Sequence, residues 1–312
     1  MPKWILALSA AAISLFSAGC SPADLSTLQP EVKAPAEFEP FLPTTNDAGE
    51  TPSQAEVGEL FSDQSEVEEA GGDPETCRSR SGSVILYSFA SPRNQSPVEG
   101  RIYLPPCYRA GDPFGLPSLY LLHGAAASDQ QWDDLGITEA ADRLIAGGEI
   151  PPLIIIMPRE PTFHHPAENP FGEQLIKDLL PWVDSHYATR AKRSHRAIGG
   201  LSRGGNWAVR LGLLHWSSFG YIGAHSTPLF RGDLRRLPGW LDGIPDPLAP
   251  ALYLDIGAGD QHLGEARELE AQLADLGAVY EWHLNPGTHT DEYWKAHLEE
   301  YLLWYTQDWG DS

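Results

Sequence analysis

The stretch AIGGLSRGG, residues 197–205, places Ser202 between a short apolar run and a segment with helical spacing. Gly200 and Gly204 stand two positions before and two positions after the serine. A turn tight enough to strain a non-glycine residue needs neighbours without side chains. The pattern therefore predicts a strand, a sharp turn and a helix, with the serine hydroxyl lifted clear of a sheet. A glycine-rich loop capped by serine fits the same letters, since the chain has 30 glycines, so the surrounding sequence has to decide.

Short apolar runs and helical patterns alternate over residues 77–312, which predicts one α/β domain. An antiparallel start should lead into a mostly parallel sheet with helices on both faces. The expected strands cover residues 83–89, 98–105, 119–124, 153–158, 197–200, 221–226, 252–257 and 279–284. The expected helices cover residues 137–146, 173–186, 204–215, 264–276 and 291–306.

The N-terminus has the form of a secretory signal, residues 1–20. Lys3 is followed by an apolar run from Trp4 to Phe16, which is too short to span a bilayer comfortably. The small residues before Cys20 are similar to a bacterial lipobox, in which the cysteine is acylated, although Ser17 stands where leucine is favoured. We expect an exported lipoprotein on the outer face of a bacterial cell membrane. Ordinary signal cleavage and secretion is the alternative.

Residues 21–76 form an acidic segment with fourteen Asp or Glu against the single cation Lys33. With only three aromatic residues, this segment has too little apolar surface to offset its ordering entropy, and we expect a disordered tether. It carries −13 of the formal charge of −22. Nucleic acid binding requires a basic face, so the charge argues against it.

Three cysteines remain to be placed in an exported chain. If Cys20 carries lipid, a disulfide between Cys77 and Cys107 is the simplest prediction, and two unpaired core cysteines are the alternative. No Cys or His spacing matches a zinc site, and the sequence predicts neither a metal nor a cofactor.

Polar residues follow several of the expected strands, and the carboxyl ends of parallel strands meet at one edge of a sheet. Ser202 needs a base, and an imidazole held by a carboxylate supplies one. His289 lies in the loop after the last strand, and Asp260 lies three residues past the strand 252–257. Asp255 is the rival acid, but it falls inside that strand and is expected to be structural. The order serine, acid, histidine is typical of α/β-hydrolases.

Acyl transfer also needs donors for an oxyanion. The backbone N–H of Arg203, at the start of the expected helix, supplies one. The loop after LYLLHG, residues 119–124, supplies the second, from Ala125 or from its neighbour Gly124.

Four segments together resemble the "putative esterase" family of α/β-hydrolases, which includes feruloyl and acetylxylan esterases, siderophore esterases, S-formylglutathione hydrolase and the antigen 85 mycolyltransferases. They are LYLLHGAAASDQQW, DLLPWVDSHYATRAKRSHRAIGGLSRGG, LYLDIGAGDQ and PGTHTDEYWKAHL, and the resemblance covers most of residues 83–306. It implies an α/β-hydrolase fold, with Ser202 as nucleophile, Asp260 as acid and His289 as base.

The chain departs from the family at two places. Arg203 stands where members often have methionine, so a cation at the site mouth could attract acidic or phosphorylated substrates, or the arginine could simply be solvated. Alanines replace the glycine-rich loop after Gly124, which should stiffen it. Trp132 matches a family aromatic and is expected either to line the substrate pocket or to lie in the core. His164, in the loop 160–172, is a candidate substrate contact or a plain surface residue.

These observations together predict a serine esterase that forms a covalent acyl-enzyme on small-molecule or saccharide-linked esters. The membrane is contacted through the lipid anchor only. An acyltransferase with the same triad and a non-catalytic binding lipoprotein on the same fold remain as alternatives.

Overall fold

The computed structural model describes residues 77, 79–93 and 96–310. The expected signal 1–20, Cys20 and the expected tether 21–76 lie outside the described residues. Within the described part of the chain, no helix is both long enough and apolar enough to cross a membrane.

Eight strands form one sheet in the order β1-β2-β4-β3-β5-β6-β7-β8. The first two neighbour pairs, β1–β2 and β2–β4, are antiparallel, and every later pair is parallel, as the sequence predicts. The strands are β1 Ser83–Phe89, β2 Val98–Leu104, β3 Ser118–Leu122, β4 Ile154–Pro158, β5 Arg196–Leu201, β6 Tyr221–His225, β7 Ala251–Gly257 and β8 Glu281–Asn285.

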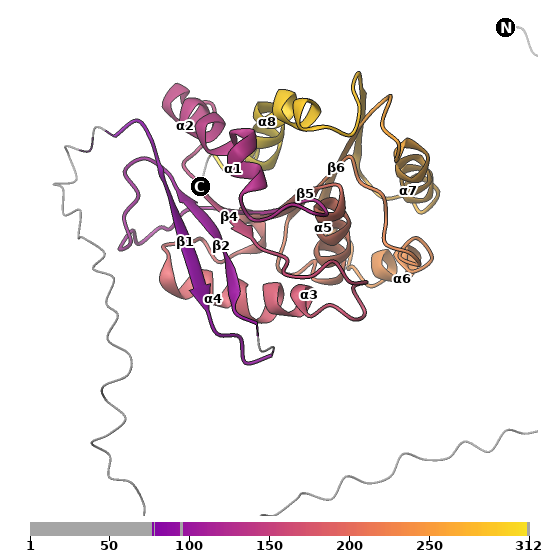
Figure 1. The fold of residues 1–312 in the computed structure, drawn as a ribbon, viewed down its shortest axis with the longest axis horizontal. Coiled ribbons are helices and arrows are strands. Elements are labelled where there is room, and N and C mark those ends of the chain that lie inside the picture. Colours follow the sequence, from indigo (N-terminus) through magenta and orange to yellow (C-terminus); the bar gives the residue numbers. More distant parts are fainter. Residues whose placement is uncertain (1–76, 78, 94–95, 311–312) are drawn as a thin grey trace, which may run out of the picture. The chain divides into compact units, whose positions relative to one another are not determined.

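Helices connect the parallel strands and cover both faces of the sheet (Figure 1). The α-helices are α1 Gln131–Leu135, α2 Ile137–Gly147, α3 Phe171–Gln174, α4 Leu180–His186, α5 Arg203–Leu214, α6 Leu237–Asp242, α7 Leu263–Asp275 and α8 Asp291–Thr306. A π-helical turn, Leu175–Leu179, joins α3 to α4, and a 3-10 turn, Arg193–His195, precedes β5.

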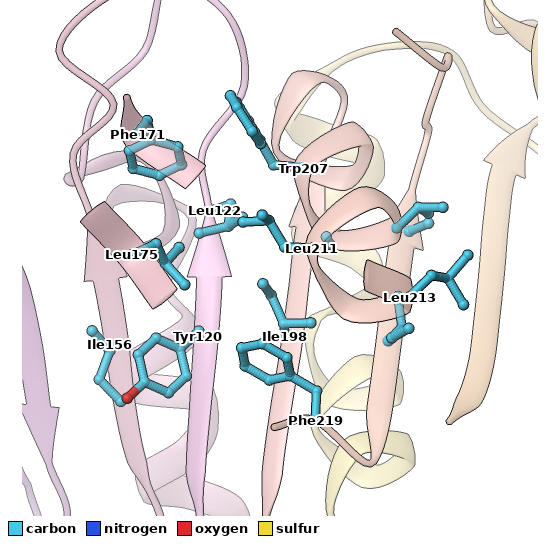
Figure 2. Packing of buried hydrophobic residues seen from close by; sticks show 14 of the residues in the cluster. Tyr120, Leu122, Ile156, Phe171, Leu175, Ile198, Trp207, Leu211, Leu213 and Phe219 are labelled. Atoms are coloured by element: carbon cyan, nitrogen blue, oxygen red, sulfur yellow. The ribbon is translucent and has the colours of Figure 1, made fainter. Parts of the chain in front are cut away.

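Two hydrophobic cores lie on the two faces of the sheet. In β3, Tyr120 and Leu122 point into the core beneath α3, α4 and α5, and this core is seen in Figure 2. Leu119 and Leu121 point into the other core, beneath α1, α2 and α8. Because both faces are covered, the central strands are continuous apolar runs without alternation.

Two helices were not expected from the sequence. Helix α1 has five residues and α6 has six, which is too short for a helical period to be recognised. The expected helix 173–186 begins at Phe171 and is divided by the π-helical turn. Strand β3 ends at Leu122, so His123 and Gly124 stand beyond the strand end, in the loop where ligands bind in such sheets.

A disulfide joins Cys77 to Cys107, with the Cα atoms 5.8 Å apart. It ties the start of the described domain to the segment after β2.

Candidate active site

Ser202 occupies the sharp turn between β5 and α5 and has φ 52° and ψ −117°. A Cβ atom on Gly200 would lie 2.4 Å from the carbonyl carbon of Gly204, and one on Gly204 would lie 2.0 Å from the Leu122 oxygen. Only glycine therefore fits on either side of the serine. The Ser202 N–H donates to the carbonyl oxygen of His225 in β6, 2.8 Å away, which fixes the turn against the sheet.

The structure brings Ser202, His289 and Asp260 together, although Ser202 and His289 are 87 residues apart in the chain. The His289 Nε2 atom lies 2.9 Å from Ser202 Oγ, and its Nδ1 atom lies 2.8 Å from Asp260 Oδ2. The Asp260 side chain is fully buried, while 17% of the His289 side chain is exposed. The imidazole thus bridges a buried carboxylate and an accessible hydroxyl.

This geometry determines the proton positions that the site can use. A carboxylate can only accept, so the hydrogen on His289 is assigned to Nδ1, and Nε2 is left as a base facing the hydroxyl. The second Asp260 oxygen accepts the backbone N–H of His262 at 2.8 Å, which holds the carboxylate in its loop. Such a chain can take the serine proton when the oxygen attacks an electrophile.

The two predicted oxyanion donors lie at the ends of β3 and β5. Within the described residues, the backbone N–H groups of Ala125 and Arg203 have no protein acceptor. The alternative donor, Gly124, is excluded because its N–H donates to Gln131 Oε1 at 2.8 Å. Gly124 nevertheless lies beside Ser202, since a Cβ atom on it would be 3.6 Å from Ser202 Cβ.

The Arg203 side chain corrects both interpretations of the sequence. It is neither a free cation nor a solvated one, because its Nε and Nη2 atoms donate to the two carboxylate oxygens of Glu160 at 2.8 and 2.6 Å. Its guanidinium carbon also lies 5.6 Å from the Phe163 ring centre and 5.0 Å from that of Phe230. The neutralised cation gives no reason to expect acidic substrates.

Trp132 belongs to the core and not to a substrate pocket. Its side chain is 1% exposed, and its indole N–H donates to the Leu122 carbonyl at 3.0 Å. The expectation that it lines the pocket is therefore wrong, and the alternative of a core tryptophan holds. The family aromatic at this place secures α1 to the end of β3 instead.

His164 lies on the surface, and its carbonyl oxygen accepts a hydrogen bond from Arg203 Nη2 at 2.5 Å. This contact with Arg203 keeps His164 near Ser202, but it is made by the backbone of His164.

Sequence reasoning missed two aromatic neighbours of His289. The Trp294 ring in α8 stands edge-on to the His289 ring, with the ring centres 5.0 Å apart. The ring of His262, the residue before α7, lies at the same distance from the His289 ring. Trp294 is held by a hydrogen bond from its indole N–H to Ser226 Oγ at 3.1 Å. Their positions just after Asp260 and His289 were the only sequence signal for either.

A surface groove of about 510 Å³ is lined by residues that follow Ala125 and His289 in the chain. It lies between the turn that follows Ala125, helix α1 and the first turn of α8, which begins two residues after His289. Its lining is mostly polar or charged: Ala127, Ser128, Gln131, Asp134, Leu135, Asp291, Glu292 and Lys295. Among the described residues, no group of three or more His, Cys, Asp or Glu side chains is arranged to hold a metal ion.

Comparison with known proteins places the chain among esterases. A family model described as "Putative esterase" matches residues 91–305. An endo-1,4-beta-xylanase/feruloyl esterase of Xylanibacter ruminicola is 29% identical over 233 residues, 70% of this chain and 31% of that protein. An esterase of Mycobacterium tuberculosis is 31% identical over 154 residues, 46% of this chain and 31% of that protein. The matched region is therefore about a third of the length of these two relatives.

The fold is also similar to that of solved esterase structures. A solved ferulic acid esterase superposes with a TM-score of 0.65 and 24% identity, covering 73% of this chain and 99% of that one. The fold is that of the α/β-hydrolases, as predicted. The chain belongs to the family described as "Putative esterase".

Proposed function

We propose that the chain is a serine esterase that hydrolyses carboxylic esters through a covalent acyl-enzyme. The observation that carries this proposal is the hydrogen-bonded chain from Ser202 Oγ through His289 to Asp260, with links of 2.9 and 2.8 Å. Ser202, the first member of this hydrogen-bonded chain, lies at the strained turn between β5 and α5, and the protein belongs to an esterase family.

The proposed reaction has two halves. Ser202 Oγ attacks the ester carbonyl while His289 Nε2 takes its proton, and Asp260 stabilises the imidazolium that forms. The backbone N–H groups of Arg203 and Ala125 bind the oxyanion, and the positive end of α5 adds to that field. The imidazolium then gives its proton to the leaving alcohol. Water repeats the sequence on the acyl-enzyme and regenerates the serine.

The proposed substrate is a small-molecule or saccharide-linked ester. The groove beside α8 is lined by residues that follow Ala125 and His289 in the chain, and its charged and amide side chains suit a hydroxyl-rich group. The Xylanibacter ruminicola relative and several solved structures carry feruloyl or ferulic acid esterase in their names, so an alkyl ferulate is the first natural-type ester to test.

Replacement of the nucleophile tests the proposed function. We expect Ser202→Ala to fold and melt like the parent and to lose at least about 10³-fold of its kcat on a short-chain p-nitrophenyl ester. Ser185→Ala, an exposed serine on α4, is the matched control and should keep full activity. Near-parental hydrolysis by the Ser202 variant would eliminate the proposed mechanism.

We also propose that Cys20 is acylated and anchors an exported enzyme to the outer face of a bacterial membrane. The lipobox-like residues before Cys20 support this proposal. In a bacterial host, Cys20→Ser should move the enzyme from the membrane fraction to a soluble or uncleaved form. Equal incorporation of a labelled fatty acid into the parent and into Cys20→Ser would contradict acylation at this cysteine.

A further inference from the structure

Glu160 is a buried acid that takes no part in the proposed triad. It lies just beyond β4 and is 4% exposed. Its carboxylate accepts two hydrogen bonds from Arg203 and a third from Asn169 Nδ2 at 2.6 Å. Removing a carboxylate from water is costly unless such partners offset the loss. The partner that offsets most of this cost is Arg203, which directly follows Ser202 in the chain.

The backbone of Glu160 makes a second connection, to His123 at the end of β3. The Glu160 N–H donates to His123 Nε2 at 2.9 Å. Because Nε2 accepts, the imidazole hydrogen is on Nδ1, which donates to the Gly124 carbonyl at 2.8 Å. Burial lowers the pKa of His123 and so favours this neutral form.

The bond from His123 to the Gly124 carbonyl controls a proposed oxyanion donor. The Gly124 C=O and the Ala125 N–H belong to one planar trans peptide and point in opposite directions. A hold on the oxygen therefore aims the N–H. The turn's own hydrogen bond is long, since the Ala127 N–H lies 3.4 Å from the same carbonyl, and Ala126 has φ 60°. A non-glycine residue in that left-handed conformation is costly, so an external hold is needed.

We propose that Glu160 is a positioning residue for the oxyanion hole. Its backbone orients the Gly124–Ala125 peptide through His123, and its carboxylate secures Arg203, whose N–H is the other donor. This inference rests on the proposed function and goes beyond it by assigning one residue outside the triad to both donors. The loop after β4 thus sets the geometry in which transition-state charge is bound, without touching the substrate.

Two substitutions of His123 separate its two hydrogen bonds. Asparagine can place a side-chain N–H near the position of Nδ1, so His123→Asn retains the donor to Gly124. Glutamine reaches the position of Nε2, so His123→Gln retains only the link to Glu160. We expect His123→Gln to lower kcat about 10- to 100-fold with KM changed less than about threefold, and His123→Asn to retain most of the parental kcat.

The ion pair between Arg203 and Glu160 has a matched control, because a second arginine of α5, Arg210, also pairs with a buried carboxylate. Arg210 and Asp233 form a second ion pair of similar burial, at 2.5 Å, and Arg210 lies over Trp240 as Arg203 lies over Phe230. Glu160→Gln should lower kcat about 10-fold or more and weaken binding of a boronic acid transition-state analogue to a similar degree. Asp233→Asn should lower the melting temperature and leave kcat unchanged.

Measurements of kcat, KM, boronate affinity and melting temperature on these variants decide the inference. A kcat loss confined to Glu160→Gln and His123→Gln supports it. Equal kcat for His123→Asn and His123→Gln, or an equal kcat loss in Asp233→Asn, would overturn it while the parent remains an esterase. A parent chain without esterase activity would overturn the proposed function and this inference with it.

Discussion

Among the described residues of the domain there are two histidine–aspartate pairs, and one of them faces a serine hydroxyl. His289 and Asp260 lie in the loops after β8 and β7, 2.8 Å apart, and the imidazole reaches Ser202. His225 and Asp255 lie inside β6 and β7, 2.6 Å apart, and both side chains are fully buried. The two pairs have the same chemistry at their centre and different surroundings.

The third partner of each pair explains the difference. The His225 Nε2 atom lies 2.9 Å from the hydroxyl of Tyr305, and Asp255 Oδ2 accepts the hydroxyls of Tyr293 and Tyr301 at 2.7 and 2.8 Å. Burial, and next the charge of Asp255, raises the pKa of Tyr301 and Tyr305 well above the ordinary value, so these phenols are not activated. A polar core network results, with no access for a substrate.

Position relative to the strand end therefore decides whether a histidine–aspartate pair can reach a hydroxyl at the edge of the sheet. Asp255 points into the core because it is within β7, whereas Asp260 stands three residues past the end of that strand. The comparison predicts that substitutions in the outer pair affect rate and those in the inner pair affect stability.

The largest expected effect is on the outer carboxylate. Asp260→Asn should lower kcat about 10⁴-fold, because an amide can hold the imidazole in the wrong tautomer. Its melting temperature should stay within a few degrees of the parent. Steady-state kinetics with a p-nitrophenyl ester measures the first, and a kcat loss under tenfold would contradict a role for this carboxylate.

The inner carboxylate should behave in the opposite way. Asp255→Asn leaves three buried donors facing a group that accepts poorly, and we expect the free energy of unfolding to fall by about 3–5 kcal/mol. The kcat per folded molecule should stay within about threefold. Urea unfolding combined with active-site titration provides both numbers, and an intact stability would show that the network is dispensable.

A smaller loss is expected at the inner imidazole. His225→Phe keeps the ring stacked on Tyr301, 3.7 Å between centres in the parent, but removes the hydrogen bonds to Asp255 and Tyr305. We expect about 2 kcal/mol of lost stability. Because the Ser202 N–H is held by the backbone carbonyl of His225, the folded variant should hydrolyse esters at the parental rate. A rate loss above tenfold would show that the inner pair also contributes to catalysis.

The smallest effect concerns His123, a buried imidazole with no carboxylate bonded to it. Its pKa lies below the ordinary value of 6.5 because of burial, so the unfolded chain binds this proton and the folded chain does not as the pH falls below about 6.5. The free energy of unfolding should fall there by at most about 1.4 kcal/mol per pH unit from this group. Urea unfolding of the parent and His123→Asn between pH 5 and pH 8, in steps of about half a pH unit, should show a flatter profile for the variant. Parallel profiles would contradict a buried neutral His123.

Much of the fold could be predicted because strands and helices each leave a pattern in the local sequence. Apolar runs without alternation marked the parallel strands, and helical spacing marked five of the longer helical segments. The members of the proposed triad were found from their places after strands, since a parallel sheet gathers its strand ends. The short helices α1 and α6 carried too few residues to show a period.

The side-chain environment could not be predicted in the same way. Whether Arg203 met solvent or a partner depended on Glu160, 43 residues away, and no local pattern links the two. The local sequence around Trp132 is compatible with a pocket-lining residue and with a core residue. The packing of α1 against β3 decides between these two roles. Pairings across loops are determined by tertiary structure, so they required coordinates.

The central claim is that Ser202 is the nucleophile activated by His289, and covalent labelling tests it most directly. A fluorophosphonate probe, followed by peptide mass spectrometry, should modify Ser202 in the parent and in folded Asp255→Asn. Labelling should be slowed at least about 100-fold in His289→Gln and be absent from Ser202→Ala. Labelling at another residue, or at Ser202 with equal speed in the His289 variant, would contradict the account.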